Sequence, residues 1–259
     1  MENTPQLNYG NWIRKKLLII LGISTLSLGG LTGLPFGPIY RLMMAILFGI
    51  TFLSFLFPLY AYYMFSQKGG RFQEKVYNLI IERLDVPGKS HILDIGSGNG
   101  VLAVQLAQQL PEAQVTGMDY WGLNWEYSKS VCEENARKGG VATRVHFQKG
   151  DAAQLEFADA TFYGAISNLT FHEVQSAADK REVVREALRV IKPGGRFAFV
   201  DYFYETKYYG NPTEFEAFLK GLNLAQFEYK PLRDLLTLPV LLRHPKILGK
   251  VGMIYGTKR

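Results

Sequence analysis

Cysteine and histidine are scarce in this chain. Its 259 residues include one cysteine, Cys132, and four histidines. A lone cysteine cannot form an intramolecular disulfide, which is typical of a reducing compartment. The histidines are scattered without the spacing of metal ligands, so the sequence predicts no metal site. The chain also lacks internal repeats and low-complexity tracts.

Charged residues are missing from most of the N-terminal quarter. None lies between Lys16 and Arg41, and the run 42–64 has none either. A helix needs about 20 apolar residues to cross a bilayer. The second run meets this length, and the first does so if it extends into the Gly- and Pro-rich segment after it. We therefore expect residues 1–65 to form a transmembrane hairpin with spans of about 17–36 and 42–64.

Basic residues flank the two expected spans on their outer ends. They are Arg14, Lys15 and Lys16 before the first span, and Lys68, Arg71 and Lys75 after the second. Only Arg41 lies between the spans. The positive-inside rule then places both ends in the cytoplasm. We expect a multi-pass protein of the cell membrane, with the bilayer as a partner and the remaining domain on the cytoplasmic side.

Two other interpretations of the N-terminal quarter stay open. A cleavable signal peptide has a similar basic start and apolar core, but no small-residue cleavage site is evident and a longer apolar run follows at once. A buried helical hairpin of a soluble protein is the second alternative. Neither run shows the polar face that a helix on a small domain's surface needs, which favours the membrane.

Net charge argues against a nucleic-acid partner. The chain carries a formal +6, and half of this excess belongs to residues 1–65, which hold Glu2 as their one acidic residue. The rest of the chain is close to balanced. Proteins that read nucleic acid usually concentrate basic residues on the folded domain. We therefore expect no nucleic acid among the partners.

Residues 66–259 have the pattern of an α/β domain. Short apolar runs alternate with amphipathic stretches, which is typical of a parallel sheet wrapped by helices. The expected strands are 91–95, 114–118, 144–148, 162–167, 196–201, 225–229 and 250–255, and the expected helices are 72–84, 101–110, 125–137, 180–191 and 213–222. The leucine-rich segment 232–248 is either an interfacial segment in a bilayer or a cover over a cleft or core.

The stretch 93–100 contains the most informative motif. An apolar strand ends in an acid, Asp94, and three alternating glycines then open a helix. Glycines at this spacing let the backbone pass close to a bulky ligand. The dinucleotide fingerprint needs its third glycine at the position of Val101. Asp94 fits poorly beside a pyrophosphate and suits a cationic ligand, such as one with an ammonium group.

Two more acids follow successive strands. Asp119 ends the second strand, where an acid can accept hydrogen bonds from ribose hydroxyls. Asp151 follows the third strand, where an adenine amine could be recognised. Ligands of open α/β sheets bind at the carboxyl ends of strands. Three acids at those ends therefore predict a nucleotide-like cofactor.

These motifs resemble those of the class I S-adenosylmethionine-dependent methyltransferases. The resemblance covers about residues 72–203 and is strongest to the small-molecule branch, which includes quinone-ring methyltransferases. It is carried by Leu93-Asp94-Ile95-Gly96-Ser97-Gly98-Asn99-Gly100, Gly117-Met118-Asp119, Gly150-Asp151-Ala152 and 188–195. Two further stretches, 119–121 and 167–174, look like a bacterial, membrane-anchored subgroup. The resemblance implies a Rossmann-like seven-stranded sheet, mostly parallel, with an antiparallel last strand beside strand five.

The resemblance also implies the cofactor and its contacts. The cofactor is S-adenosylmethionine, with the methionine end on the glycine loop and its acid, ribose on Asp119 and adenine beside Asp151. The expected cofactor-binding residues are Asp94, Gly96, Ser97, Gly98, Gly100, Asp119, Tyr120, Asp151, Ala152 and Asn168.

His172 and Glu173 are the candidate catalytic residues. They follow the fourth strand, where relatives place residues that face the methyl group. His172 could take a proton from an acceptor, or it could merely cap a helix or pack over the cofactor. We expect a membrane-anchored methyltransferase that acts on a small, lipophilic acceptor. The alternatives are a cofactor-binding membrane scaffold without transfer activity and a nicotinamide oxidoreductase.

Overall fold

The computed structural model describes residues 6–122 and 126–259. The chain forms two compact units. Residues 10–74 form the first, which we call the hairpin unit. Of the described residues, 6–9 and those from 75 to 259 form the second, which we call the sheet unit. Residues 66–74 group with the two helices of the hairpin unit, and residues 6–9 group with the sheet unit.

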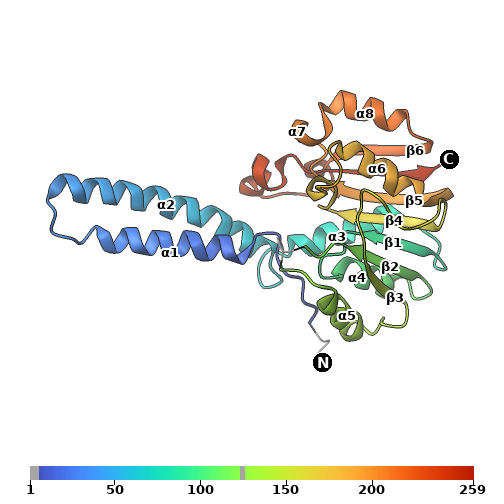
Figure 1. Cartoon of the computed structure of the whole chain (residues 1–259), viewed down its shortest axis with the longest axis horizontal. Coiled ribbons are helices and arrows are strands. Elements are labelled where there is room, and N and C mark those ends of the chain that lie inside the picture. The colour runs from blue at the N-terminus through green and yellow to red at the C-terminus, as the bar shows by residue number, and fades with distance from the viewer. Residues whose placement is uncertain (1–5, 123–125) are drawn as a thin grey trace. The chain divides into compact units, whose positions relative to one another are not determined.

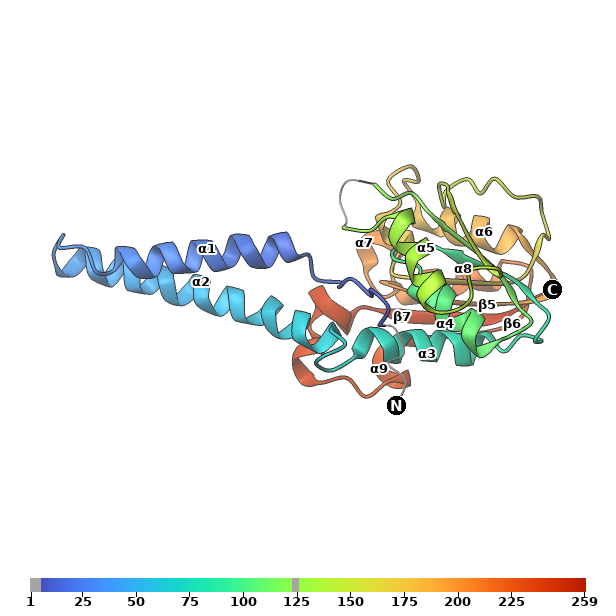
Figure 2. The same cartoon turned by 90° about the horizontal axis from the view of Figure 1, so that it is seen from below.

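The hairpin unit contains two helices that run side by side, α1 (Lys15–Leu31) and α2 (Pro38–Phe65) (Figure 1 and Figure 2). Gly29 lets them approach, because a Cβ there would lie 3.2 Å from the Phe48 ring. A turn with Gly37 at φ 94° leads into Pro38, the first residue of α2. Proline suits that position because its missing N–H has no helical partner there.

The two helices differ in their fitness to cross a bilayer. Among the described residues, α2 is the one helix long and apolar enough to do so, with a mean hydropathy of 2.3 over its best window. Helix α1 has 17 residues and ends at Leu31. The expected first span of 17–36 was therefore too long, because the Gly- and Pro-containing turn after Leu31 does not continue the helix.

The sheet unit contains a seven-stranded sheet in the order β3-β2-β1-β4-β5-β7-β6 (Figure 1). Its strands are β1 (His91–Ile95), β2 (Gln114–Asp119), β3 (Val145–Lys149), β4 (Phe162–Asn168), β5 (Ile191–Asp201), β6 (Leu224–Pro231) and β7 (Gly252–Lys258). The first five are parallel, and β7 runs antiparallel between β5 and β6. This confirms the expected Rossmann-like sheet with an antiparallel last strand.

Helices cover both faces of this sheet. They are α3 (Phe72–Leu84), α4 (Val101–Gln109), α5 (Lys129–Lys138), α6 (Lys180–Arg189), α7 (Thr206–Tyr209) and α8 (Pro212–Lys220). On β1, Leu93 faces a buried cluster that includes Val184 of α6. Ile92 points to the opposite face, where it and Leu84 of α3 surround Gly164. Burial on both faces explains why β1 has apolar residues at the consecutive positions Ile92 and Leu93.

Two expected helices have different bounds in the structure. Helix α5 begins at Lys129 instead of residue 125, because the Ser128 side chain accepts a hydrogen bond from the Val131 N–H and caps the helix there. Trp125 lies outside the described residues. Helix α6 ends at Arg189, and β5 already begins at Ile191 with a register shift against β4. Pro193, Gly194 and Gly195, which lie between the expected helix 180–191 and the expected strand 196–201, are therefore part of β5, where the register shift against β4 occurs.

The leucine-rich segment 232–248 is not one continuous helix. It consists of α9 (Leu232–Leu235), a 3-10 turn (Val240–Arg243) and a wide turn (Pro245–Gly249). Some leucines of the segment are buried, among them Leu238 and Leu242, whereas Val240 and Leu241 are exposed. The segment therefore covers part of the core with one side and presents two apolar side chains outward.

Candidate active site

The candidate site lies where the carboxyl ends of the parallel strands meet. The last residues of β1, β2 and β4, together with the loops after β1, β2 and β3, carry every residue expected to bind the cofactor. Hydrogen bonds join neighbouring strand ends: the Gly96 N–H donates to the Met118 carbonyl at 2.7 Å, and the Gly150 N–H donates to the Asp119 carbonyl at 3.0 Å. The ends of β1, β2 and β3 thus form one continuous polar edge, the usual ligand position in such sheets.

The glycine loop after β1 has a backbone that only glycine accommodates easily. Gly96 has φ 79°, and a Cβ on it would lie 1.9 Å from the Thr170 hydroxyl oxygen. Gly100 has φ 74°, and a Cβ there would lie 2.6 Å from the Phe147 ring. Both positions combine a left-handed backbone with close packing. The loop therefore keeps a shape that a side chain at either position would disrupt.

Asp94 is the most unusual carboxylate of the site. Its side chain is 1% exposed, and its Oδ2 atom has no hydrogen-bond partner. Burial raises the pKa of Asp94 to about 7, and the charge of Asp119 adds to this effect. A buried carboxylate oxygen without a partner is costly. Asp94 is therefore prepared to accept a hydrogen bond from a cationic group, which fits the ammonium group of the expected cofactor.

Asp119 holds the glycine loop from the neighbouring strand. Its Oδ2 accepts the Gly98 N–H at 2.8 Å, and its Oδ1 accepts the Trp121 N–H at 2.7 Å. The Trp121 indole in turn donates to the Gly98 carbonyl at 2.9 Å. Burial raises the pKa of Asp119, although these N–H groups oppose the shift. Each carboxylate oxygen retains a further lone pair for a ribose hydroxyl.

The remaining expected cofactor residues differ in their environments. Ser97 donates from its hydroxyl to the Asp94 carbonyl at 3.1 Å and so closes the first turn of the loop. Tyr120 is exposed beside Asp119, with Lys149 over its ring. Asp151 accepts the Ala153 N–H at 2.9 Å, and Ala152 is buried. These four residues lie around the polar edge formed by β1, β2 and β3.

Asn168 ends β4 and faces the same region. Its Oδ1 atom is buried and has no hydrogen-bond partner. Two residues later, the Thr170 hydroxyl donates to the Gly96 carbonyl at 3.4 Å. The loop after β4 is thus linked to the glycine loop. Asp94 and Asn168 together leave two buried oxygens that a donor group of a ligand would satisfy.

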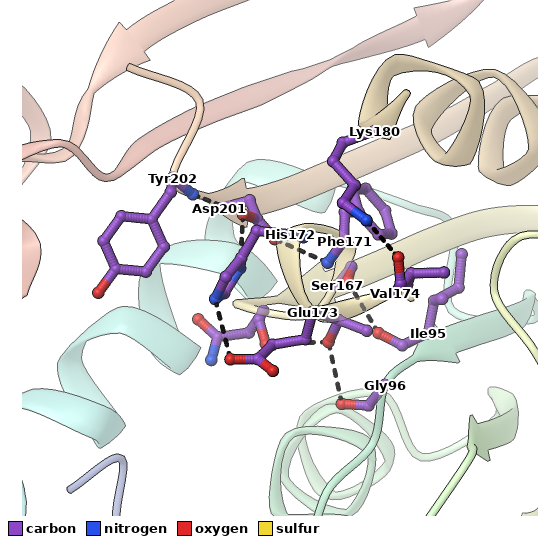
Figure 3. Close-up of polar contacts among 12 residues, drawn as sticks. Ile95, Gly96, Ser167, Phe171, His172, Glu173, Val174, Lys180, Asp201 and Tyr202 are labelled. Atoms are coloured by element: carbon purple, nitrogen blue, oxygen red, sulfur yellow. Dashed lines mark hydrogen bonds and ion pairs between the residues drawn. The ribbon is translucent and has the colours of Figure 1, made fainter. Parts of the chain in front are cut away.

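His172 forms a buried pair with Asp201 at the end of β5 (Figure 3). The His172 Nδ1 atom lies 2.8 Å from Asp201 Oδ1. Asp201 is fully buried, and its other oxygen accepts the Phe171 N–H at 2.8 Å. The rings of Tyr202 and Tyr208 flank the imidazole at centroid distances of 4.7 and 5.5 Å. His172 therefore has a fixed orientation.

The charge state of His172 follows from this environment. Burial disfavours the imidazolium, but the charge and hydrogen bond of Asp201 outweigh burial, and Glu173 adds to their effect. Together, Asp201 and Glu173 raise the pKa of His172 to about 9. Glu173 is half-exposed, and its Oε1 lies 3.6 Å from His172 Nε2. At neutral pH the imidazole is thus protonated, with Nδ1–H directed at Asp201 and Nε2 toward Glu173.

Sequence reasoning missed Asp201 and the two tyrosines. A signal was available, because Asp201 ends strand five and so follows the same rule as Asp94 and Asp119. Tyr202 and Tyr208 had no comparable signal, because nothing in their local sequence indicates that they contact His172, which follows β4. Among the described residues, no three His, Cys, Asp or Glu side chains form a cluster that could hold a metal ion.

Comparison with known families supports the interpretation of these motifs. A family model described as "Methyltransferase domain" matches residues 88–229, more than half of the chain. The match begins just before β1 and includes the glycine loop, the acids after β2 and β3, and the His172–Asp201 pair.

Curated relatives are methyltransferases of several kinds. The ubiquinone/menaquinone biosynthesis C-methyltransferase UbiE of Desulfotalea psychrophila is 33% identical over 122 residues, which cover 47% of this chain and 45% of that protein. The O-methyltransferase rstn1 of Aspergillus nomiae is 33% identical over 130 residues, which cover 50% and 54%. The chain spans about half the length of the curated relatives it matches.

Solved structures share the fold at low sequence identity. A geranyl diphosphate methyltransferase in complex with SAM superposes with a TM-score of 0.55 at 14% identity, over 89% of this chain and 95% of that one. The [4+2]-cyclase SpnF superposes with a TM-score of 0.53 at 19% identity, over 72% and 80%. The second likeness shows that this fold also occurs in a protein named for another reaction.

Proposed function

Because the chain belongs to the methyltransferase domain family, whose cofactor is S-adenosylmethionine, we propose that it is a membrane-anchored enzyme that methylates a small, lipophilic acceptor. The observation that carries this proposal is Asp94, a buried carboxylate with an unpartnered oxygen at the base of a glycine loop. A buried oxygen without a partner destabilises the folded protein, and a donor group of a bound ligand would offset that cost.

The chain's own residues fit each part of the cofactor. Asp94 and Asn168 offer buried acceptor oxygens to the ammonium group of the methionine end. Asp119 offers lone pairs to the ribose hydroxyls, and Asp151 follows β3, where the adenine amine is recognised in this family. Tyr120, exposed next to Asp119, supplies an aromatic face that can cover the adenine.

The bound cofactor supplies a methyl group on a positively charged sulfur, and the protein must align the acceptor with it. Transfer of this kind depends strongly on orientation. His172 is rigid enough for this task, because Asp201 fixes its ring and two tyrosines flank it. We propose that His172 and Glu173 face the acceptor and that Asp201 is a positioning residue acting through His172.

The proton chemistry of His172 depends on pH. Only the neutral imidazole can accept a proton from an acceptor hydroxyl, and the raised pKa of His172 makes this form a minority at pH 7. We propose that the deprotonated form is the active base. Asp201 then stabilises the imidazolium that forms when the acceptor proton arrives at Nε2.

The hairpin unit supports the membrane part of the proposal. Helix α2 contains no charged residue from Leu42 to Phe65 and exposes large apolar side chains such as Leu53 and Ile39. Exposed apolar surface of this extent indicates a partner or a bilayer. We propose that α1 and α2 enter the cell membrane as a hairpin with both ends in the cytoplasm. An enzyme anchored in this way meets lipophilic acceptors at the membrane surface.

Titration of the full chain in detergent with S-adenosylmethionine and, separately, with NADH tests the cofactor assignment. We expect saturable binding of S-adenosylmethionine, no binding of NADH, and weaker binding by the Asp119→Ala variant. Glu112→Ala is the matched control, because Glu112 lies just before the start of β2 and thus away from the carboxyl ends of the strands. Binding of NADH alone would favour the oxidoreductase, and equal binding by the Asp119→Ala variant would refute the site.

A further inference from the structure

Asn8, which precedes the hairpin unit in the sequence, is connected to the glycine loop by hydrogen bonds. Asn135, a fully buried residue of α5, connects the two. Its Oδ1 accepts the main-chain N–H of Asn8 at 2.8 Å, and its Nδ2 donates to the Asn8 carbonyl at 2.9 Å. The same Nδ2 donates to the carbonyl of Asn99, between the second and third glycines, at 2.8 Å.

Further contacts strengthen this connection. The Asn99 side-chain amide lies 3.3 Å from the Asn8 carbonyl. The Tyr9 hydroxyl accepts a hydrogen bond from Gln105 Nε2 of α4 at 2.6 Å. The Tyr9 ring stacks on Tyr77 of α3 with centroids 6.1 Å apart. Asn8 and Tyr9, which we call the N-terminal brace, thus contact three helices and the glycine loop.

The glycine loop needs support of this kind. Gly96, Gly98 and Gly100 all have positive φ angles, and glycine loses more backbone freedom on ordering than any other residue. On one side the loop is held by Asp119 and Trp121, which bond to both polar groups of Gly98. The brace and Asn135 hold Asn99 from α5. The loop is therefore fixed between two sets of hydrogen bonds.

We propose that the N-terminal brace, acting through Asn135, positions the glycine loop for S-adenosylmethionine, so that cofactor affinity depends on the residues just before the membrane hairpin. This inference rests on the proposed function, since it assumes that the loop holds the cofactor. Asn8 and Asn135 are positioning residues and do not themselves contact the ligand. A brace that only stabilises the fold would leave cofactor affinity unchanged.

The test is the Asn8→Pro variant in the full chain, with Asn8→Ala as its matched control. Proline removes the N–H that donates to Asn135, whereas alanine keeps both main-chain groups. The readouts are the Kd of S-adenosylmethionine, by calorimetry in detergent, and hydrogen exchange of residues 96–100. For the Asn8→Pro variant we expect an increase in Kd of about three- to tenfold, as for one or two lost hydrogen bonds, and faster exchange. The control should remain within about twofold of the unsubstituted protein.

A second variant covers the case in which Asn8→Pro does not fold. Tyr9→Phe keeps the ring stack on Tyr77 and removes the hydroxyl that accepts the Gln105 bond. We expect a Kd increase of about three- to fivefold, above the limit set for the control, with faster exchange in the loop. Unchanged affinity and exchange in a folded Asn8→Pro variant, or in Tyr9→Phe if the former does not fold, would overturn the proposal. If the unsubstituted protein does not bind S-adenosylmethionine, the proposed function itself fails, which is a separate result.

Discussion

The hairpin unit exposes large apolar side chains, whereas the sheet unit buries them. In the hairpin, leucines and isoleucines such as Leu26 and Ile39 are 77% exposed. In the sheet unit, Ile92 and Leu93 are completely buried, and two carboxylates, Asp94 and Asp201, are buried with them. The hairpin therefore suits an apolar surrounding, whereas the sheet unit buries charge where a ligand is expected. The absence of charged residues separates the hairpin from the rest of the sequence, but the burial of Asp94 and Asp201 is evident only in the structure.

The largest expected effect concerns a buried charge pair of the sheet unit. We expect His172→Asn to lower the rate of methyl transfer by about 100- to 10,000-fold, the usual contribution of a general base. In the unsubstituted enzyme the rate should rise with pH up to about 9, because only the neutral imidazole accepts a proton and the pKa of His172 is raised to about 9. Initial rates from pH 6 to 10 measure this. If the rate does not change with pH and the His172→Asn variant stays active, the His172–Asp201 pair has only a structural role.

The next effect concerns the exposed apolar surface of the hairpin. Leu53→Lys places a charge near the middle of α2, where insertion into a bilayer costs about 3 kcal/mol, or about a hundredfold in partitioning. Carbonate extraction of membranes should release much more of this variant than of the unsubstituted protein. Leu53→Met is the matched control and should remain in the membrane fraction. Equal retention of both variants would contradict a bilayer around α2.

Asp94→Asn separates cofactor binding from stability. We expect it to weaken S-adenosylmethionine binding by about ten- to a hundredfold, because the ammonium loses its charged partner. At pH values above 7, the same variant should have a higher melting temperature than the unsubstituted protein. The folded state keeps a proton on Asp94 up to about pH 7, while the unfolded chain releases it near pH 4, so stability falls as pH rises through this window.

Differential scanning fluorimetry at pH 5 and pH 8 checks the stability part. The asparagine variant should gain most at pH 8, because this pH lies above the raised pKa of about 7 and the buried carboxyl then loses its proton. Lower melting temperatures for the variant at both pH values would mean that Asp94 is a structural group satisfied without a ligand.

The smallest expected effect is a pH dependence of cofactor affinity. A cationic ligand binds the ionised form of Asp94, and this form becomes rare below the raised pKa of the free protein. We expect the Kd of S-adenosylmethionine to rise about eightfold between pH 7.5 and 6.0, as the ionised fraction of Asp94 falls. Calorimetric titrations at both pH values measure the Kd. In the Asp94→Asn variant the Kd should not change between these pH values. A pH-independent Kd in the unsubstituted protein would argue against a contact between Asp94 and the ammonium.

Local patterns predicted much of the fold. The expected bounds of α3 (Phe72–Leu84) and β1 (His91–Ile95) match the structure, because apolar periodicity is clear in both segments. The antiparallel β7 was expected only from the family resemblance, since a strand's direction leaves no trace in its own sequence. Helix α1 ended earlier than expected, because its apolar run continues into a turn that hydropathy alone does not separate from a helix.

The acids of the candidate site were predictable, and their partners were not. Asp94, Asp119 and Asp151 follow a positional rule that applies to each strand separately. The bond between His172 and Asp201, and the bond between Asn8 and Asn135, join residues that are far apart along the chain. Such contacts arise from the packing of whole elements, so no local pattern contains them.

The most direct test of the central claim is transfer of a labelled methyl group. The full chain in membranes of its host is incubated with S-adenosylmethionine that carries a labelled methyl, and the label is followed into the solvent extract, the protein and the aqueous phase. We predict a labelled small molecule in the solvent extract, and much less of it with the Asp94→Asn variant at the same cofactor concentration. Saturable cofactor binding with no labelled product in any fraction would contradict the account and favour a cofactor-binding scaffold.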